Sequence, residues 1–181
     1  MVEPAASEPS FQQAMEITAQ WLGLWEQGEL SDEVLADRVA ELVGSRDGAR
    51  GFFVVSLAGE CPLMDRMPEA LVMQLRAAGE GVVDLSARNL AMSTAMALHH
   101  ARSGDGDQQA GSERVQSRCI ELLRQLEPEA VKRRLESLLA AAQAGGGDAS
   151  GDDGAFLERW GYDEQQKAAI AEAILSVAES A

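Results

Sequence analysis

The stretch Gly51–Arg102 reads GFFVVSLAGECPLMDRMPEALVMQLRAAGEGVVDLSARNLAMSTAMALHHAR. Within it, residues 81–102 contain no proline, and their only glycine is the first residue. Proline and glycine are the residues that most strongly disfavour a helix interior. The pattern therefore predicts a central buried helix over about 81–102, with the other helices packed around it.

The composition also favours helices. Of the 181 residues, 46% are hydrophobic and only 4% are aromatic, and much of the apolar content is alanine, leucine and methionine. These three residues are good helix formers, and a chain of this length commonly forms one domain. We therefore predict an all-α fold, a compact bundle of about six or seven helices around the central one.

The chain is expected to consist of four segments. These are a disordered lead over 1–9, a helical core over 10–143, a flexible Gly/Asp loop over 144–154 and a C-terminal helical segment over 155–181 that packs on the same domain. The loop is assigned on composition, because GGGDASGDDG is rich in glycine and aspartate.

Capping residues and prolines indicate where the helices begin. Serine and aspartate side chains accept hydrogen bonds from the free N–H groups of a first turn, and proline is tolerated there. Helices are predicted to begin next to Ser10, Ser31, Pro68, Ser112, Pro128 and Asp163. The stretch Gly51–Gly59 alone has strand-like content. We interpret it as a buried turn of helix or an extended connector, because a lone short strand has no partner.

The charge balance excludes some partners. A net charge of −15 argues against anionic surfaces, so neither a nucleic acid nor a membrane is predicted as a partner. Nearly half of the basic residues gather in a short part of the chain, namely Arg102, Arg114, Arg118, Arg124, Lys132, Arg133 and Arg134. They could form a basic patch, but we favour a solvated helix face of mixed charge.

The N-terminus and the cysteines bear on the compartment. The first residues, MVEPAASEPS, lack the basic and apolar regions of a secretory signal, and no apolar run approaches the ~20 residues that span a bilayer. We expect a cytoplasmic protein in which Cys61 and Cys119 are reduced, small buried hydrophobes. The two cysteines form no CxxC pair.

No metal, cofactor or catalytic residue is predicted. His99 and His100 are neighbours, so on a helix they point about 100° apart and cannot chelate one ion together. The segment SGDGDQQAGS after Arg102 is interpreted as a polar linker, because its glycine spacing does not fit a calcium loop. The chain contains no GxSxG, P-loop or GxGxxG motif.

The methionines motivate the first of two functional hypotheses. Met92 and Met96 on the central helix suggest an adaptable apolar surface for a partner helix, although plain core packing also explains methionines there. This hypothesis is a non-catalytic protein-interaction, assembly or regulatory protein. Its partner is another protein or, by self-association, a second copy in a homodimer.

The second hypothesis is an anionic-ligand-binding domain or small enzyme. Its pocket would be lined by Asn89, His99, Arg102, Arg114 and Arg118. Arg114 and Arg118 lie one helical turn apart, the spacing at which two guanidinium groups can hold one carboxylate or phosphate. Asn89 has an alternative interpretation as a buried amide bonded to a neighbouring backbone group.

Three segments carry a resemblance. They are GFFVVSLAGECPLMDRMPEALVMQLR, VVDLSARNLAMSTAMALHHAR and GSERVQSRCIELLRQL. They resemble a small helical family of uncharacterised cyanobacterial proteins, with chloroplast relatives, over about residues 11–142. The resemblance carries no active site, so it assigns no functional residue. It implies a protein of the cytoplasm or the chloroplast stroma of a photosynthetic cell.

Overall fold

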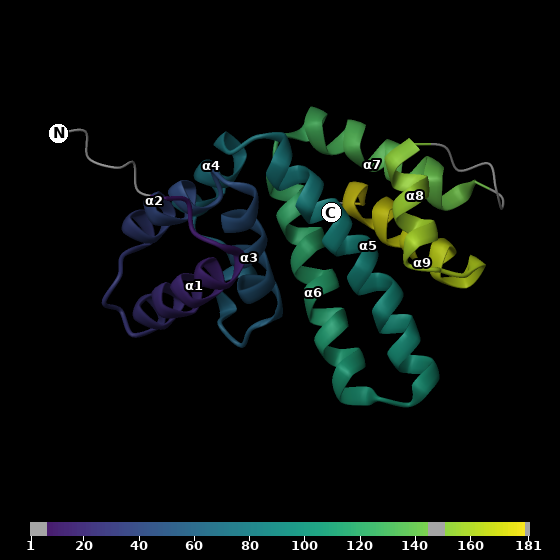
Figure 1. Cartoon of the computed structure of the whole chain (residues 1–181), viewed down its shortest axis with the longest axis horizontal. Coiled ribbons are helices and arrows are strands. Elements are labelled where there is room, and N and C mark those ends of the chain that lie inside the picture. The colour runs from purple at the N-terminus through teal and green to yellow at the C-terminus, as the bar shows by residue number, and fades with distance from the viewer. Residues whose placement is uncertain (1–6, 145–150, 180–181) are drawn as a thin grey trace. The chain divides into compact units, whose positions relative to one another are not determined.

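The structure is a computed structural model that describes residues 7–144 and 151–179, and these residues form an all-α fold (Figure 1). Within these two ranges there are nine α-helices, one short 3-10 helix and no strand. The predicted fold class is therefore confirmed. The helices are more numerous than expected, because two segments that we interpreted as loop or connector are largely helical.

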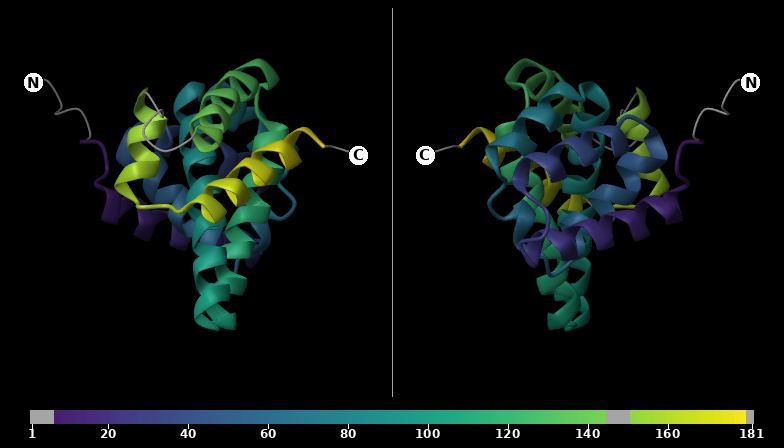
Figure 2. Two further views of the ribbon diagram at one scale, coloured as in Figure 1. Left: turned by 90° about the vertical axis from the view of Figure 1, so that its right-hand side faces the viewer. Right: turned by 90° about the vertical axis from the view of Figure 1, so that its left-hand side faces the viewer.

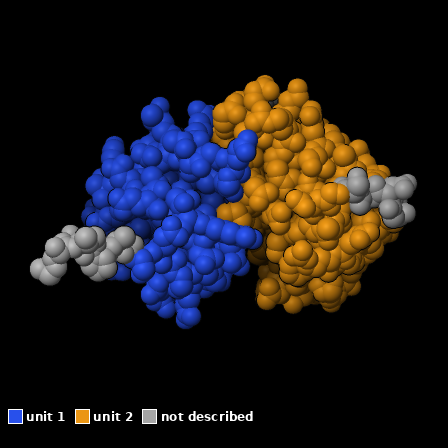
Figure 3. Space-filling model, turned by 45° about the horizontal axis from the view of Figure 1, so that its top comes forward, with its two compact units in different colours: residues 1–82 blue, residues 83–181 orange. Residues whose placement is uncertain are grey.

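The helices divide between two compact units, residues 1–82 and residues 83–181 (Figure 3). The first unit contains α1 (Phe11–Glu26), α2 (Asp32–Leu42), α3 (Arg46–Ala58), η1 (Pro62–Met64) and α4 (Glu69–Ala77). The second contains nearly all of α5 (Glu80–Ser103), followed by α6 (Gly106–Gln125), α7 (Pro128–Gln143), α8 (Gly151–Arg159) and α9 (Glu164–Ala178). This boundary lies within the predicted core over 10–143.

The stretch with strand-like content is a helix. Ser45 caps α3 by accepting a hydrogen bond from the backbone N–H of Gly48, and the helix then continues through the β-prone residues to Ala58. Phe52 and Phe53 are both fully buried. Burial on two sides of the helix outweighs the modest β-propensity of these residues. Of our two interpretations, the buried helix is correct and the extended connector is wrong.

Gly51 allows α1 and α3 to pack closely. A Cβ atom at Gly51 would lie 2.9 Å from both the backbone nitrogen of Met15 and the carbonyl oxygen of Phe11, and closer still to the Cβ of Ala14. Ala14 is itself fully buried. The two helices therefore meet at small residues, with backbone against backbone, and this contact organises the first unit.

In the second unit, α5 and α6 form an antiparallel hairpin, which Figures 1 and 2 show from three directions. The side chain of Asp105 caps α6 by accepting from the N–H of Gln108, and Gly104 adopts a positive φ in the turn. The predicted start next to Ser112 is therefore wrong, and most of the predicted polar linker is the first turns of α6. The N-cap at Asp105 explains the earlier start.

The buried face of α5 is not the one that the large side chains indicate. Met96 and His99 are exposed, although they lie in the predicted buried helix over 81–102, whereas Ala87, Ala91 and Ala95 are fully buried. Alanine lets neighbouring helices approach closely, so the close-packed face follows the small residues. The predicted helix over 81–102 is present, but its buried side chains all lie between Val82 and Ala97.

Of the predicted Gly/Asp loop over 144–154, the structure describes Ala144 and residues 151–154, and residues 151–154 are helical. Residues 145–150 lie outside the described residues, Ala144 caps the end of α7, and α8 begins at Gly151. Asp153, expected to be in a flexible loop, is buried at 7% exposure. Its carboxylate accepts two hydrogen bonds from Arg134, at 2.8 and 2.9 Å, and one from Ser137 at 2.7 Å. Satisfying this buried carboxylate fixes α8 against α7.

Other predicted helix starts are confirmed. Ser10 and Asp163 each form a capping box with a glutamine three residues later. Ser31 caps α2, and Pro128 is the first residue of α7. Among the described residues, no helix has both the length and the apolar character needed to cross a membrane.

Gly51→Ala is expected to destabilise the chain by about 1–3 kcal/mol, because overpacking against the backbone of α1 forces the two helices apart. The measurement is the free energy of unfolding in urea. The matched control is Gly23→Ala in α1, where a Cβ meets nothing within 4 Å. That change should stabilise by about 0.5–1 kcal/mol through helix propensity alone. Equal effects from the two changes would contradict the close contact.

Candidate functional site

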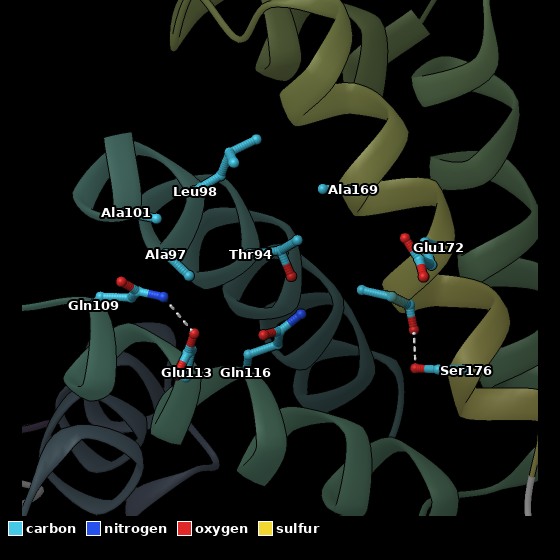
Figure 4. A pocket seen from close by; sticks show the side chains of 11 residues that line it. Thr94, Ala97, Leu98, Ala101, Gln109, Glu113, Gln116, Ala169, Glu172 and Ser176 are labelled. Atoms are coloured by element: carbon cyan, nitrogen blue, oxygen red, sulfur yellow. Dashed lines mark hydrogen bonds between the residues drawn. The ribbon is translucent and has the colours of Figure 1, made fainter. Parts of the chain in front are cut away.

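Two hollows in the described part of the second unit lie on different sides of α9. The first, which we call the acidic pocket, has a volume of about 420 Å3 and lies among α5, α6 and α9 (Figure 4). It is lined by Thr94, Ala97, Leu98, Ala101, Gln109, Glu113, Gln116, Ala169, Glu172, Ala173 and Ser176. No lysine, arginine or histidine is among these residues.

Several polar groups of the acidic pocket are already bonded. The Gln109 amide donates to the Glu113 carboxylate at 2.9 Å, and the Ser176 hydroxyl donates to the carbonyl oxygen of Ala173 at 2.6 Å. Neither Glu113 nor Glu172 has an ion pair within the described residues. The pocket therefore concentrates negative charge that no cation of the described chain neutralises.

Thr94 places a buried hydroxyl group without a hydrogen-bond partner among the described residues at the acidic pocket. It is 4% exposed, and its hydroxyl oxygen has no hydrogen-bond partner in the described part of the chain. Figure 4 shows this oxygen pointing toward the amide of Gln116 across the interior of the pocket. A buried hydroxyl without a partner costs free energy, so its presence at the wall of a cavity is a reason to look for a ligand.

The second hollow, which we call the α7–α9 groove, is larger and apolar. Its volume is about 520 Å3. It is lined by Leu123, Arg124, Leu126, Pro128, Val131, Lys132, Leu135, Glu136, Leu139, Ile174, Leu175, Val177 and Ala178. Leu175 is 50% exposed in it. An exposed leucine beside a row of apolar side chains is typical of a surface that binds another apolar surface.

Three charged residues also line this groove. Arg124 already has partners within the chain. Its guanidinium donates to the carbonyl oxygens of Ser176 and Val177 and pairs with Glu121. Lys132 and Glu136 lie one turn apart on α7, and neither has an ion pair or a hydrogen bond within the described residues. The groove therefore offers one cation and one anion to a partner.

The structure places Asn89, His99 and Arg102 in separate surroundings along α5. The Asn89 amide donates to the carbonyl oxygen of Leu85 at 2.9 Å, as its backbone-bonded interpretation predicts. His99 is exposed, and its ring lies edge-on to that of His100. Arg102 pairs with Asp163 at 2.6 Å, so its guanidinium already holds a carboxylate of the chain.

The other predicted residues also lie outside both hollows. Arg114 is half-buried and Arg118 is 3% exposed, and both interact with other groups. Met92 is half-buried, and Met96 is 39% exposed. None of the five residues of the predicted anion pocket lines either hollow. The anionic-ligand hypothesis, and the role of Met92 and Met96 as a partner surface, stay predictions.

The solvated-face interpretation of the basic cluster is wrong for two of its members. Arg118 is buried, and the Arg134 side chain is 17% exposed in its pair with Asp153. Arg134 also pairs with Asp84 of α5 at 2.9 Å. Charge patterning alone could not distinguish Arg134 from a solvated arginine, because its partners Asp84 and Asp153 are distant in sequence.

The acidic pocket was missed at the sequence level although a signal for it exists. Gln109, Glu113 and Gln116 have 4-3 spacing, which places three polar side chains on one face of a helix. We assigned the first of them to a linker, so the row was not recognised. With α6 starting at Gly106, the row becomes one wall of the pocket.

The thiols do not add a nucleophile. Cys61 and Cys119 are both buried thiols that form no disulfide within the described residues, as predicted. Burial raises the pKa of the Cys119 thiol to about 12, so it is protonated at neutral pH and unreactive. Within the described residues, no three histidine, cysteine, aspartate or glutamate side chains are placed to hold a metal ion.

The fold and the two hollows define an all-α protein whose second unit has an acidic pocket and an apolar groove. The chain belongs to the family described as uncharacterised conserved protein UCP020893, whose model matches residues 10–177. This match covers nearly the whole chain and agrees with the predicted resemblance to an uncharacterised family. Neither the curated proteins nor the solved structures gave a match to the chain.

The pair between Arg102 and Asp163 is expected to make stability depend on pH. The Arg102 hydrogen bond, together with the backbone N–H of Gln166, lowers the pKa of Asp163 from 3.8 to about 2. The ionised Asp163 carboxylate therefore contributes fully to the free energy of unfolding above pH 3.8, and this contribution is lost as the pH falls toward 2. The measurement is the unfolding free energy of wild type and Asp163→Asn against pH. Asparagine keeps the N-cap, so the difference should be constant at neutral pH and shrink across this window.

Thr94→Val is expected to stabilise the chain by about 1 kcal/mol. Valine replaces the hydroxyl with a methyl group of similar size and so removes a buried polar atom that has no partner in the described structure. Urea unfolding of the two proteins measures the change. Thr18→Val is the matched control, because the Thr18 hydroxyl donates to the carbonyl oxygen of Ala14 at 2.7 Å. A loss of stability at Thr94 would show that its hydroxyl is satisfied.

Proposed function

We propose that this chain is a non-catalytic assembly protein that self-associates through the α7–α9 groove. The observation that carries the proposal is the row of apolar side chains between α7 and α9, with Leu175 half exposed at its edge. Burying such a row against a second apolar surface is favourable by a free energy of about 25 cal/mol for each Å2 of apolar surface removed from water. The proposal requires no cofactor and no catalytic group.

The charges at the groove favour a second copy of the chain as the occupant. In a two-fold symmetric dimer both protomers use the same surface. If one residue of a protomer contacts a second residue of the partner, the reverse contact also forms. If two α7 helices lie antiparallel across the axis, Lys132 of each protomer comes opposite Glu136 of its partner. These two residues lack an ion pair within the described chain, and the symmetric arrangement pairs each of them once, which makes two Lys132–Glu136 pairs per dimer.

The overall charge opposes this association at long range. Each protomer has a formal charge of −15, so two protomers repel one another in water of low ionic strength. Added salt screens this repulsion over a distance of ~8 Å at physiological ionic strength, whereas burial of apolar surface is little affected. The dimer is therefore expected to form more readily at moderate than at very low salt.

The resemblance to cyanobacterial and chloroplast proteins implies a cytoplasmic or stromal location. That location stays a prediction. Self-association through the groove does not depend on it.

Sedimentation velocity at increasing protein concentration tests the proposal. Wild type is expected to change from monomer to dimer, and Leu175→Glu should raise the dimer dissociation constant by about tenfold or more, because it buries an unpaired charge. The control is Met73→Glu on α4, which changes an apolar side chain that is 63% exposed and lies outside the groove. This control should leave the dissociation constant unchanged.

A charge swap tests the symmetric arrangement itself. Lys132→Glu alone should weaken the dimer, because it sets two glutamates against one another. Lys132→Glu combined with Glu136→Lys should restore it, since each pair is then reversed. A wild type that stays monomeric at every concentration and salt would overturn the proposal. So would a complex with a different protein that Leu175→Glu abolishes while the chain alone is monomeric.

A further inference from the structure

We propose that the acidic pocket binds a small aliphatic amine. This inference goes beyond self-association through the α7–α9 groove and depends on different residues. The acidic pocket lies among α5, α6 and α9, and its volume of about 420 Å3 is within the range of ligand pockets, roughly 300–1,000 Å3.

Charge selects the ligand class. Glu113 comes from α6 and Glu172 from α9, and Figure 4 shows both carboxylates at the pocket. No basic residue lines the pocket, and neither carboxylate has an ion pair within the described chain. Both carboxylates are exposed to solvent at the pocket. An anionic ligand would be repelled here, whereas an ammonium group would be attracted to the two carboxylates.

The apolar part of the lining suits a methylene chain. Between the polar groups of the pocket lie small aliphatic side chains from two helices, namely Ala97, Leu98, Ala101, Ala169 and Ala173. These groups offer contact to CH2 groups but no hydrogen bonds. The combination of acidic and aliphatic surface favours an amine on an aliphatic stem over a compact inorganic cation.

Thr94 gives the independent reason for a ligand. Its buried hydroxyl oxygen has no partner in the described residues, and the amide of Gln116 across the pocket has none either. An ammonium group has three N–H donors. The Thr94 hydroxyl, the Gln116 carbonyl oxygen and one carboxylate are three acceptors in the pocket lining, which is the number that one ammonium group can satisfy.

Calorimetric titration with butane-1,4-diamine tests the proposal. Saturable binding is expected, together with a rise in Tm that grows with ligand concentration. Butane-1,4-diol and succinate have the same carbon chain but are neutral and anionic, and neither should bind. Affinity should fall as salt is added, because part of the attraction is between charges.

Three variants locate the bound amine. Glu172→Gln should weaken binding about tenfold by removing one carboxylate without changing the size of the side chain. Thr94→Val should weaken amine binding several-fold, because it removes one hydrogen bond to the ligand. Thr94→Ser keeps the hydroxyl and should bind the amine like wild type. The control Glu158→Gln lies on α8, exposed and outside both hollows, and should bind like wild type.

Three results would overturn the proposal. They are no saturable binding of the diamine, equal binding of the diol, and equal weakening by Glu158→Gln and Glu172→Gln, which would show attraction by the net charge alone. The titration is repeated with Leu175→Glu, whose change lies in the α7–α9 groove. Amine binding should persist there, so failure of one proposal does not decide the other.

Discussion

The carboxylate of Asp153 loses nearly all of its hydration when α8 packs on α7, and Arg134 and Ser137 replace the lost water. A buried charge without such partners costs several kcal/mol, so this contact constrains how α7 is rotated about its axis. Arg134 must face α8 and Asp84. Val131, Leu135 and Leu139 then line the groove with α9, and Lys132 and Glu136 lie at its edge. The groove therefore depends on a polar contact outside it.

Both hollows depend on α9 as well. Glu172 and Ala173 line the acidic pocket, whereas Ile174 and Leu175 line the groove, so adjacent residues of one helix serve different sites. Arg124 of α6 holds the end of α9 by donating to the carbonyl oxygen of Ser176 at 2.6 Å. A shift of α9 along its axis would change both hollows at once. The two sites thus share an element through which binding at one could be coupled to binding at the other.

Much of the fold could be predicted because its signals are local. The side chains of Ser10 and Asp163 mark the starts of helices, because each accepts a hydrogen bond from the backbone N–H three residues later. Such caps can be recognised in the sequence. The helix α3 could not be assigned with the same clarity. Phe52 and Phe53 favour a strand by propensity, and only packing on several sides makes a helix the better solution. The close contact at Gly51 is equally non-local, since the atoms that require a glycine belong to α1.

The sites were harder to predict than the fold, because each is made by residues whose neighbours lie on other helices. Arg118 and Arg134 have the sequence surroundings of solvated arginines, yet burial gives them structural roles. Conversely, Thr94 has the surroundings of a core residue, and only the absence of a partner for its hydroxyl among the described residues distinguishes it. Sequence patterns report which face of a helix is polar. They do not report whether that face meets water, a partner helix or a cavity, and this difference decides between a solvated surface and a binding site.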